Sequence, residues 1–462
     1  MVLIKSISGV RGTIHKDDNK GLSSFEIKKC IEQFSFWLKQ YENCKVQKGL
    51  IVIGRDGRIS GDKILNQISD ILIKLNYNVL NLSLTTTPSV QMAIITEKCI
   101  GGIMVSASHN PMNWNGLKFL NSEGEFLSKK QSEQFYNIQR NYQIKNESTL
   151  KSGTVNYFDY KEKHTSLILN LSDVDVDTIR IKKFKIVVDG INSSGGVFVP
   201  FLLEKLGVEV IKLNCVPDGN FSHNPEPLSN NLTELSDLVV STGADLGIAV
   251  DPDVDRLVFI CEDGSFFGEE YTIVAIAKYI LSNRIGNTVC NLSSSNALKD
   301  ITLSFGGNHF YSPVGEANVI QVMKENNAIF GGEGSGGVIF PELHYGRDAL
   351  VGIALFLSLI SRSNLKITEL KNMLPQYFML KEKIKISDDF SFDKFLLKYE
   401  NYLQEKDIIL IDGLRINLDC GSWVHIRRSN TEPIIRIISE SSSKDKAIEL
   451  MEDFIMKLKN LK

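Results

Sequence analysis

The sequence predicts an α/β protein built from several domains, and two features of the chain lead to this prediction. Within 462 residues, one strand–helix–strand pattern occurs three times, whereas residues 371–462 combine short strands with two helices. Strand–helix–strand units fold into parallel or mixed sheets with helices on their faces. We therefore predict three related α/β domains with mixed sheets, followed by a smaller C-terminal α+β domain.

Each copy of the pattern places an apolar strand first, a helix next and a second strand last. In the first copy, apolar residues at helical spacing form one helix face: Ile64, Leu65, Ile68, Ile71, Leu72 and Leu75. The second copy ends in KLGVEVIKL (205–213), which aligns with KLNYNVLNL (74–82) of the first. The copies extend over residues 50–82, 185–213 and 287–315.

The C-terminal region has a different order of elements, with a helix, several strands and a final helix. We expect these elements at 392–404, 407–418, 422–428, 433–439 and 444–459. The polar segment 146–153 and the segment 367–375 are candidate linkers. The pattern predicts domains at 1–150, 151–258, 259–370 and 371–462.

Composition excludes several classes of protein. The chain has 52 basic and 55 acidic residues, so it lacks the basic excess expected of a nucleic-acid-binding protein. Its first residues lack the apolar core of a signal peptide, and the longest apolar run, 349–360, predicts a buried helix because it is too short to cross a bilayer. We expect a cytoplasmic protein, monomeric or homodimeric, that binds neither membrane nor nucleic acid. Seven scattered cysteines favour a reducing compartment: Cys30, Cys44, Cys99, Cys215, Cys261, Cys290 and Cys420.

The first candidate site is the sequence SASHNP at 106–111, here named the serine loop, which follows the apolar run 100–105. Ligands of open α/β sheets bind at the carboxyl ends of strands, where this loop falls. Pro111 disfavours helical geometry at Asn110, so we expect the loop to stay open. Serine, histidine, asparagine and proline are also ordinary turn residues. The loop alone therefore indicates either a reactive Ser108 or a polar turn.

The second candidate is DPDVDR at 251–256, here named the aspartate loop, which follows the apolar residues 246–250. Carboxylates at alternating positions of a strand end point the same way and repel one another, so Asp251, Asp253 and Asp255 call for a cation such as Mg²⁺. An EF-hand is excluded because Arg256 stands where that loop requires glycine. Two alternatives stay open: an exposed acidic turn, and a haloacid-dehalogenase motif with Asp251 as nucleophile, although that motif usually opens its fold.

The third candidate is GGEGSGG at 331–337, the glycine loop. Glycines allow the backbone to approach a ligand closely. Glu333 and Ser335 then offer an acceptor and a hydroxyl group suited to sugar hydroxyls. A flexible turn explains the glycines equally well.

The fourth candidate is RRSNTEP at 427–433, the arginine turn, which lies between two expected strands. Its hydrogen-bond donors suit bidentate recognition of a phosphate. The alternative is a solvated hairpin tip. The donors of this turn and of the next strand are Arg427, Ser429, Asn430, Thr431 and Arg436.

In this order and spacing, the four motifs resemble those of the α-D-phosphohexomutase superfamily, which contains phosphoglucomutases, phosphomannomutases and phosphoglucosamine mutases. The resemblance extends over nearly the whole chain and includes SGVRG (8–12), GRDGRISG (54–61) and NGLKF (115–119). It implies four domains around one cleft. The stretch 331–352 looks most like bacterial phosphoglucosamine mutases.

The resemblance implies a role for each motif. Ser108 would be the phosphorylated serine, and its phosphate would complete a Mg²⁺ site formed by the aspartate loop residues Asp251, Asp253 and Asp255. Lys118 would lie near the reacting oxygen, and the basic residues implied around the transferred phosphate are Arg11, His109 and Arg256. Glu333 and Ser335 would contact the sugar, and Arg427, Ser429, Asn430 and Thr431 would bind the distal phosphate.

The implied reaction interconverts a hexose 6-phosphate and its 1-phosphate through a phosphoserine enzyme and a hexose 1,6-bisphosphate intermediate, which also serves as activator. Glucosamine phosphate is the expected substrate, with glucose and mannose phosphates as alternatives. A haloacid-dehalogenase-type transferase using Asp251 and a non-catalytic sugar-phosphate-binding protein stay open as other classes.

Two stretches depart from the pattern of the superfamily. Gly337 stands where many members have histidine, and VGEANV (314–319) stands where TGH or VGD is common. Because both lie near the expected sugar site, they leave the identity of the hexose open. His344 and Arg347 are candidates to replace the missing histidine.

Overall fold

The fold is described from a computed structural model. It covers residues 2–15, 20–41, 49–138, 153–363, 365–385, 391–399, 407–428 and 434–460. The chain divides into two compact units, one formed by Met1–Thr272 with Ser335–Leu370 and the other by Ile273–Gly334 with Lys371–Lys462. The domain boundaries drawn from the sequence stay predictions.

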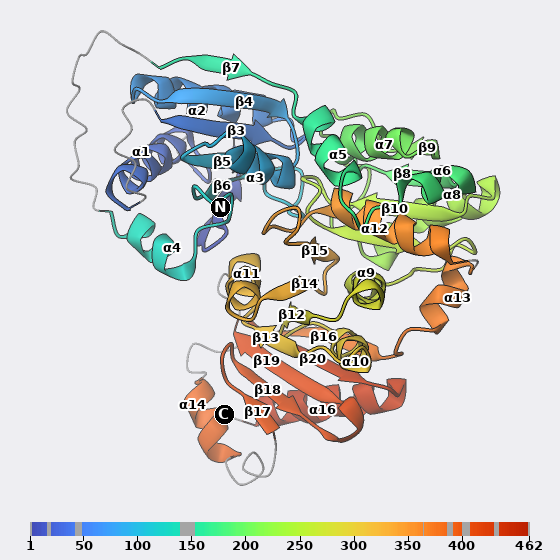
Figure 1. The fold of residues 1–462 in the computed structure, drawn as a ribbon. Coiled ribbons are helices and arrows are strands. Elements are labelled where there is room, and N and C mark those ends of the chain that lie inside the picture. Colours follow the sequence, from blue (N-terminus) through green and yellow to red (C-terminus); the bar gives the residue numbers. More distant parts are fainter. Residues whose placement is uncertain are drawn as a thin grey trace. The chain divides into compact units, whose positions relative to one another are not determined.

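The first unit begins with a seven-stranded sheet of strand order β1-β2-β6-β5-β3-β4-β7. Figure 1 shows the part of this sheet that runs from β7 through β4, β3 and β5 to β6. Strands β3, β4, β5 and β7 are parallel, whereas β6, β2 and β1 add antiparallel pairs, so the sheet is mixed. Its strands are β1 (Leu3–Ser6), β2 (Gly9–Thr13), β3 (Leu50–Arg55), β4 (Asn78–Leu84), β5 (Gly101–Val105), β6 (Trp114–Leu120) and β7 (Val155–Tyr157). Its helices are α1 (Ser24–Tyr41), α2 (Gly61–Lys74), α3 (Thr87–Thr96) and α4 (Lys129–Tyr136).

A second sheet of the same unit has the order β11-β10-β8-β9. Three of its strands are parallel, and β11 returns antiparallel to β10. The strands are β8 (Lys185–Asp189), β9 (Glu209–Leu213), β10 (Leu246–Val250) and β11 (Leu257–Ile260). The helices are α5 (Lys161–Leu169), α6 (Val176–Lys182), α7 (Gly195–Lys205) and α8 (Thr233–Thr242), with a short 3₁₀ turn at Ser229–Asn231.

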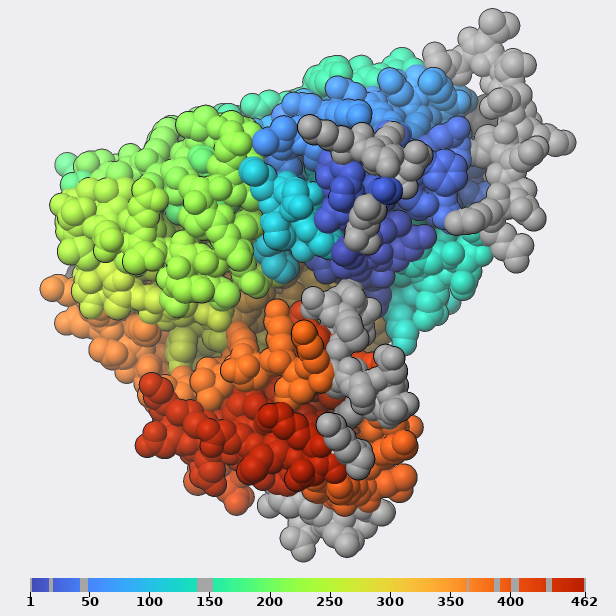
Figure 2. Space-filling model, turned by 180° about the vertical axis from the view of Figure 1, so that it is seen from behind, coloured from blue at the N-terminus to red at the C-terminus, as the bar shows by residue number. Residues whose placement is uncertain are grey.

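The two sheets of the first unit are joined by hydrogen bonds between their loops. Ser194 Oγ donates to the carbonyl of Thr85, and the N–H of Gly57 donates to Ser193 Oγ. Figure 2 shows green atoms of the second sheet's region against blue and cyan atoms of the first. The unit also contains β15 (Gly337–Ile339) and the buried helix α12 (Ala349–Arg362), as predicted for the run 349–360.

The second unit contains a parallel arrangement of β13, β12 and β14 and a five-stranded antiparallel sheet of order β16-β20-β19-β18-β17. The first group consists of β12 (Asn287–Asn291), α10 (Ala297–Ser304), β13 (His309–Ser312), α11 (Glu316–Glu325) and β14 (Ala328–Glu333). The second consists of β16 (Phe378–Lys385), α14 (Phe392–Lys398), β17 (Asp407–Ile409), β18 (Leu414–Asn417), a 3₁₀ turn (Asp419–Gly421), β19 (Trp423–Arg428), β20 (Ile434–Ser441) and α16 (Lys444–Lys459). Helices α9 (Glu269–Asn283) and α13 (Ile367–Asn372) begin in the first unit and end in the second.

The predicted fold class is confirmed. The three strand–helix–strand copies are β3–α2–β4, β8–α7–β9 and β12–α10–β13, and the C-terminal region is a smaller α+β domain. Helix α2 forms because Ile64, Leu65, Ile68 and Leu72 share one face, and all four are buried. Within the described residues, no helix combines the length and apolar character needed to cross a bilayer.

Candidate functional site

The serine loop and the aspartate loop occupy equivalent places in the two sheets of the first unit. The serine loop leaves the carboxyl end of β5 and returns through the antiparallel strand β6. The aspartate loop leaves the carboxyl end of β10 and returns through the antiparallel strand β11. Both preceding strands are fully buried, so each loop emerges from the core at a fixed point. The predicted positions of both loops at strand ends are confirmed.

The structure brings Ser108 onto the aspartate loop. Ser108 Oγ donates a hydrogen bond of 2.7 Å to Asp251 Oδ2, and the backbone at Ser108 adopts a left-handed conformation with φ of 47°. Ser106 Oγ donates instead to Asp56 Oδ2 at 2.7 Å. The side chains of the two serines therefore have different partners, and Ser108 is the one that contacts the aspartate loop.

The three aspartates form a compact group of oxygen ligands. Asp251, Asp253 and Asp255 are fully buried, and one ligand atom from each lies within 4.8 Å of the others. Among the residues that the structure describes, Asp253 Oδ1 and Asp255 Oδ1 are buried and have no hydrogen-bond partner. Buried carboxylate oxygens are costly to leave unpaired, and a hard divalent cation satisfies them with the ligands it prefers. The residues present thus fit Mg²⁺.

Two cationic side chains offset the charge of this group. Lys118 Nζ, on β6, donates to Asp253 Oδ2 and lies 3.1 Å from Asp255 Oδ2. Arg347 Nη2 donates to the same Asp255 oxygen at 2.8 Å. Thr87 Oγ1, at the start of α3, also donates to Asp253. The aspartate loop is therefore surrounded by donors from three separate segments of the first unit.

These neighbours separate the pKa values of the aspartates. Burial, with the charges of Asp255 and Asp253, raises the pKa of Asp251 well above its usual range. Burial acts in the same direction on Asp255, but Arg347, Lys118 and Arg256 outweigh it and lower the pKa of Asp255. Burial disfavours the charged form of Lys118, yet Asp253 and Asp255 raise the pKa of this lysine. Lys118 and Asp255 consequently stay ionised at neutral pH.

The other residues implied around the transferred phosphate also lie beside the serine loop. His109 Nδ1 lies 3.3 Å from Ser108 Oγ, and Arg11 Nη1 donates to Asn110 Oδ1 at 2.9 Å. The positive charge of Arg256, burial and then Arg11 lower the pKa of His109 well below its usual value. Arg256 itself forms an ion pair of 3.2 Å with Glu226. A neutral His109 thus stands among cations.

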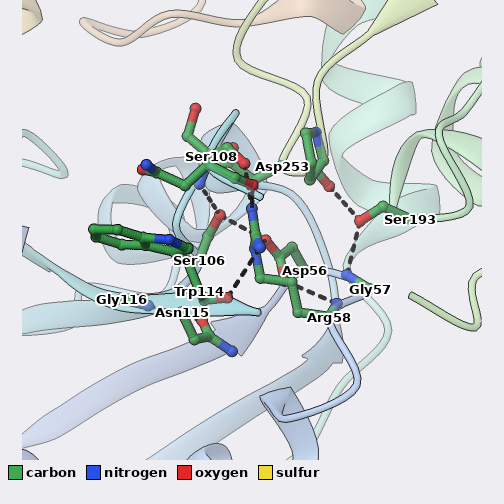
Figure 3. Close-up of polar contacts among 12 residues, drawn as sticks. Asp56, Gly57, Arg58, Ser106, Ser108, Trp114, Asn115, Gly116, Ser193 and Asp253 are labelled. Carbon is green, nitrogen blue, oxygen red and sulfur yellow. Dashed lines mark hydrogen bonds and ion pairs between the residues drawn. The ribbon is translucent and has the colours of Figure 1, made fainter. Parts of the chain in front are cut away.

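Sequence reasoning missed three residues that shape the serine loop. Asp56 and Arg58 are buried and hydrogen-bond with the loop, and Ser193 joins their segment to the aspartate loop (Figure 3). The stretch GRDGRISG contributed to the family resemblance, but no role was assigned to it. The sequence did offer a signal for these residues, because Asp56 and Arg58 follow closely after the apolar strand LIVIG. Their partners are distant in sequence and could not be identified from the pattern.

Gly337 makes room for Arg347. A Cβ atom at position 337 would lie 2.3 Å from Arg347 Cδ, so the arginine side chain passes directly over the glycine on its way to Asp255. His344, the other candidate to replace a histidine at 337, is buried and lies 3.3 Å from Asp348 Oδ2. The space at Gly337 is therefore occupied by Arg347.

The remaining predicted residues fall mostly in the second unit. Arg427 and Arg436 lie directly opposite each other on β19 and β20. Burial lowers the pKa of Arg427, and the positive charge of Arg436 lowers it further. The negative charges of Asp412 and Glu333 act in the opposite direction, so these charged groups act on one another. Glu333 Oε1 accepts hydrogen bonds from Asn291 and from the N–H of Gly315, in the VGEANV stretch. The structure thus brings the glycine loop's glutamate and the first arginine of the arginine turn within electrostatic reach of each other.

Four other predicted residues are not placed in this group. Ser429, Asn430 and Thr431 lie outside the described residues. Ser335 begins the segment of the glycine loop that belongs to the first unit, where it is half-buried. Asp412, which was not predicted, faces Arg427 at 3.6 Å and accepts the N–H of Val314 at 2.9 Å.

Comparison with families of known proteins gives matches along nearly the whole chain. Models of the phosphoglucomutase/phosphomannomutase α/β/α domains I, II and III match residues 5–145, 162–264 and 268–378. The model of the C-terminal domain of the same family matches residues 383–457.

Individual relatives agree with these matches. A phosphoglucomutase/phosphomannomutase of Thermococcus kodakarensis is 35% identical over 88% of this chain and 89% of its own. A protein of Methanopyrus kandleri named "Probable phosphoglucosamine mutase" is 33% identical, again over 88% of this chain and 89% of its own. The crystal structure of a phosphoglucomutase/phosphomannomutase family protein from Burkholderia thailandensis superposes with a TM-score of 0.83 at 24% identity, over 99% of this chain and 98% of its own.

Proposed function

The chain belongs to the phosphoglucomutase/phosphomannomutase family, and from that premise we propose that it interconverts glucosamine 6-phosphate and glucosamine 1-phosphate. The enzyme is a phosphohexomutase, an isomerase that works by intramolecular phosphoryl transfer. Glucose or mannose phosphate is the second candidate substrate, because the Thermococcus kodakarensis relative is named phosphoglucomutase/phosphomannomutase.

The contact between Ser108 Oγ and Asp251 Oδ2 is the observation that best supports the proposed mechanism. This contact sets the serine hydroxyl, the group that would carry the phosphate, directly against the oxygen ligands of the proposed cation site. Asp251 itself is a poor nucleophile here, because both of its oxygens accept hydrogen bonds, Oδ1 from the N–H groups of Asp255 and Arg256 and Oδ2 from Ser108 Oγ. Ser108 is therefore the proposed phosphoserine, in preference to an aspartyl phosphate at Asp251.

Asp251, Asp253 and Asp255 would hold Mg²⁺ together with an oxygen of the phosphoserine. When bound, the cation neutralises charge on the phosphoryl oxygens. Lys118 lies against two of these aspartates and adds a permanent positive charge. Phosphoryl transfer depends mainly on positioning and charge neutralisation, which this group of residues supplies.

Arg11, His109 and Arg256 complete the proposed phosphate-transfer site. The two arginines supply fixed charge, and the neutral imidazole of His109 can exchange a hydrogen bond with Ser108 without adding charge. The proposed cycle starts with phospho-Ser108, which transfers its group to the 6-phosphosugar. The hexose 1,6-bisphosphate then turns around, and its other phosphate returns to Ser108.

We place the phosphate that is not being transferred on Arg427 and Arg436, whose cross-strand pairing presents two guanidinium groups from adjacent strands. The arginine turn residues Ser429, Asn430 and Thr431 are proposed to add hydrogen bonds to it. Glu333, held by Asn291 and the N–H of Gly315, and Ser335 are proposed to contact sugar hydroxyls.

A parallel assay tests this function. The purified enzyme is given Mg²⁺, a trace of the matching 1,6-bisphosphate and, in separate reactions, the 6-phosphates of glucosamine, glucose and mannose. We expect 1-phosphate to form fastest from glucosamine 6-phosphate and no turnover in Ser108→Ala. A higher kcat/KM for glucose or mannose phosphate would select the second candidate, and turnover by Ser108→Ala would overturn the mechanism.

A further inference from the structure

Arg58 uses every hydrogen-bond donor of its side chain on the serine loop and its support. A guanidinium group has five N–H donors. Nη2 donates to the carbonyls of Ser108 and Asn110, each at 2.6 Å, and Nη1 donates to the carbonyls of Pro111 at 2.7 Å and Trp114 at 2.9 Å. Nε donates to Asp56 Oδ2 at 3.2 Å. Figure 3 shows this side chain beside the loop. Four carbonyls along the turn from β5 to β6 are thus fixed by one residue.

Arg58 is 1% exposed, and its guanidinium group also lies 5.0 Å from the ring centre of Phe221. Burying a guanidinium group is costly unless its donors are satisfied. Here the donors are satisfied by backbone carbonyls and by one buried carboxylate. Replacement by lysine would keep the charge but could not reach four carbonyls in a fixed plane.

Asp56 holds the other side of the same residue, Ser108. Asp56 Oδ2 accepts from Ser106 Oγ, and Ser106 Oγ accepts the N–H of Ser108 at 2.9 Å. The N–H of Ser108 is therefore tied to Asp56 through Ser106, while its carbonyl is tied to Arg58. Serine has no intrinsic preference for positive φ, so this conformation persists only when its surroundings impose it. With both peptide groups fixed, the position of the Ser108 Cβ is also fixed, and from there Ser108 Oγ reaches Asp251 Oδ2 at 2.7 Å.

The residue between Asp56 and Arg58 reaches the aspartate loop. The N–H of Gly57 donates to Ser193 Oγ at 2.8 Å, and Ser193 Oγ donates to the carbonyl of Pro252 at 2.7 Å. A Cβ atom at Gly57 would lie 2.6 Å from Ser193 Cα, so the close approach requires glycine. Residues 56–58 therefore contact the serine loop on one side and, through Ser193, the aspartate loop on the other.

We propose that Asp56 and Arg58 are positioning residues for phosphoryl transfer, which hold Ser108 Oγ against the aspartate loop without contacting the sugar phosphate. This inference rests on the proposed function of Ser108 as phosphoserine. A displacement of about 1 Å between reacting groups lowers a rate by roughly 100-fold. Loss of Arg58 should therefore slow transfer to and from Ser108 while leaving the affinity for substrate unchanged.

The test compares Arg58→Lys with Ser106→Ala, which removes the link between Asp56 and the N–H of Ser108 but leaves the buried Asp56–Arg58 pair in place. For each, we would measure the rate of label transfer from phospho-Ser108 to the 6-phosphosugar in a single turnover, kcat and KM, and the thermal midpoint. We expect the transfer rate and kcat of Arg58→Lys to fall about 100-fold and those of Ser106→Ala about 10-fold, with KM within about twofold of wild type. The control is Arg180→Lys, whose guanidinium donates to the carbonyl of Lys205 at the surface and should change none of these values.

Each outcome distinguishes between the two proposals. A wild-type enzyme that gains no phosphate on Ser108 would refute the proposed function. A wild type labelled on Ser108, with Arg58→Lys and Ser106→Ala variants that fold and transfer at wild-type rates, would refute the positioning role alone. If Arg58→Lys does not fold, a wild-type transfer rate in folded Ser106→Ala would overturn the inference. A rise in KM equal to the fall in kcat/KM, with kcat unchanged, would also overturn it, because it would indicate a substrate-binding role.

Discussion

The serine loop and the aspartate loop have the same place in the fold but are held in different ways. Each follows a buried parallel strand and returns in an antiparallel one, and each contains a non-glycine residue at positive φ, 47° at Ser108 and 64° at Val254. The aspartate loop fixes much of its own shape, because Asp251 accepts the N–H groups of Val254, Asp255 and Arg256. The serine loop is fixed by Arg58 and Asp56, which lie about fifty positions earlier in the chain.

Because of this difference, the shape of the two loops and the charge of the proposed site depend on different residues. In the aspartate loop, the backbone is held by the carbonyl and Oδ1 of Asp251. The other oxygen of Asp251, with Asp253 and Asp255, is left for a cation, and the last two also pair with Lys118 and Arg347. In the serine loop, the nucleophile depends on a distant arginine for its direction. Substitutions in the aspartate loop outside Asp251 should therefore alter charge without altering shape, and substitutions around the serine loop should do the reverse.

The largest effect is expected for Asp253→Asn. Removing one carboxylate from the group of three weakens the cation site, and we expect kcat to fall about 10²–10³-fold, the loss typical when one group that stabilises transition-state charge is removed. The loop should keep its shape because Asp251 is untouched, so circular dichroism and the thermal transition should stay cooperative. An exposed acid on α8 supplies the control, Asp237→Asn. A kcat equal to wild type at saturating Mg²⁺ would contradict the assignment of Asp253 to the cation site.

The next effect concerns Arg347 and the glycine beneath it. Arg347→Ala removes the positive partner of Asp255, and Gly337→Ala places a methyl group where Arg347 Cδ now lies. Both substitutions should therefore lower kcat. Contacting residues show coupling energies of 0.5–3 kcal/mol, and we expect about 2 kcal/mol here. In the Arg347→Ala background, Gly337→Ala should have almost no further effect. Additive losses in the double variant would show that the glycine acts independently of Arg347.

A smaller effect is expected outside both loops, at Arg427. Arg427→Lys keeps the positive charge but loses the two-pronged donor geometry. Loss of one hydrogen bond to a charged group, about 1.5 kcal/mol, raises KM for the 6-phosphosugar about tenfold. The value of kcat should change little, since Arg427 is proposed to bind the phosphate that is not transferred. If kcat falls while KM stays constant, Arg427 does not bind that phosphate.

The smallest effect concerns His425 and the way the free energy of unfolding depends on pH. Burial, only partly opposed by Asp412, lowers the pKa of His425 to about 4 from the usual histidine value of about 6.5. Between these values the unfolded chain binds the proton more strongly, so the free energy of unfolding decreases as pH falls from 6.5 toward 4. His425→Gln should remove this component, making the loss of stability between pH 6.5 and pH 5 smaller by about 1.5 kcal/mol. Urea unfolding at the two pH values measures it, and identical pH dependence in both proteins would refute the neutral, buried state of His425.

The comparison also explains which parts of the site the sequence revealed. The aspartate loop was recognisable because its acids stand at alternating positions directly after an apolar strand, so spacing alone placed them together. Ser108 and Lys118 were identified through the family motifs. The hydrogen bonds of Arg58 with Ser108 and of Ser193 with Gly57 connect residues far apart in sequence, and no local pattern encodes them.

The fold was predicted to a similar extent. Elements with a clear apolar period, such as β3, α2 and α16, lie close to where the sequence placed them. Strand β16 was missed because its segment, FMLKEKIK, is rich in lysine and glutamate and lies at the edge of its sheet, where its side chains are half-buried or exposed. The place of Arg347 over Gly337 likewise depends on tertiary packing, which a sequence pattern does not specify.

The chemistry of the phosphoenzyme tests the central claim most directly. The enzyme is labelled with a radioactive hexose 1,6-bisphosphate, denatured and treated with hydroxylamine, which cleaves an acyl phosphate but not a serine phosphate. We predict that the label survives, that peptide mass spectrometry places it on Ser108 and that Ser108→Ala takes up none. A hydroxylamine-labile label that persists in Ser108→Ala would place the phosphate on an aspartate and contradict the account.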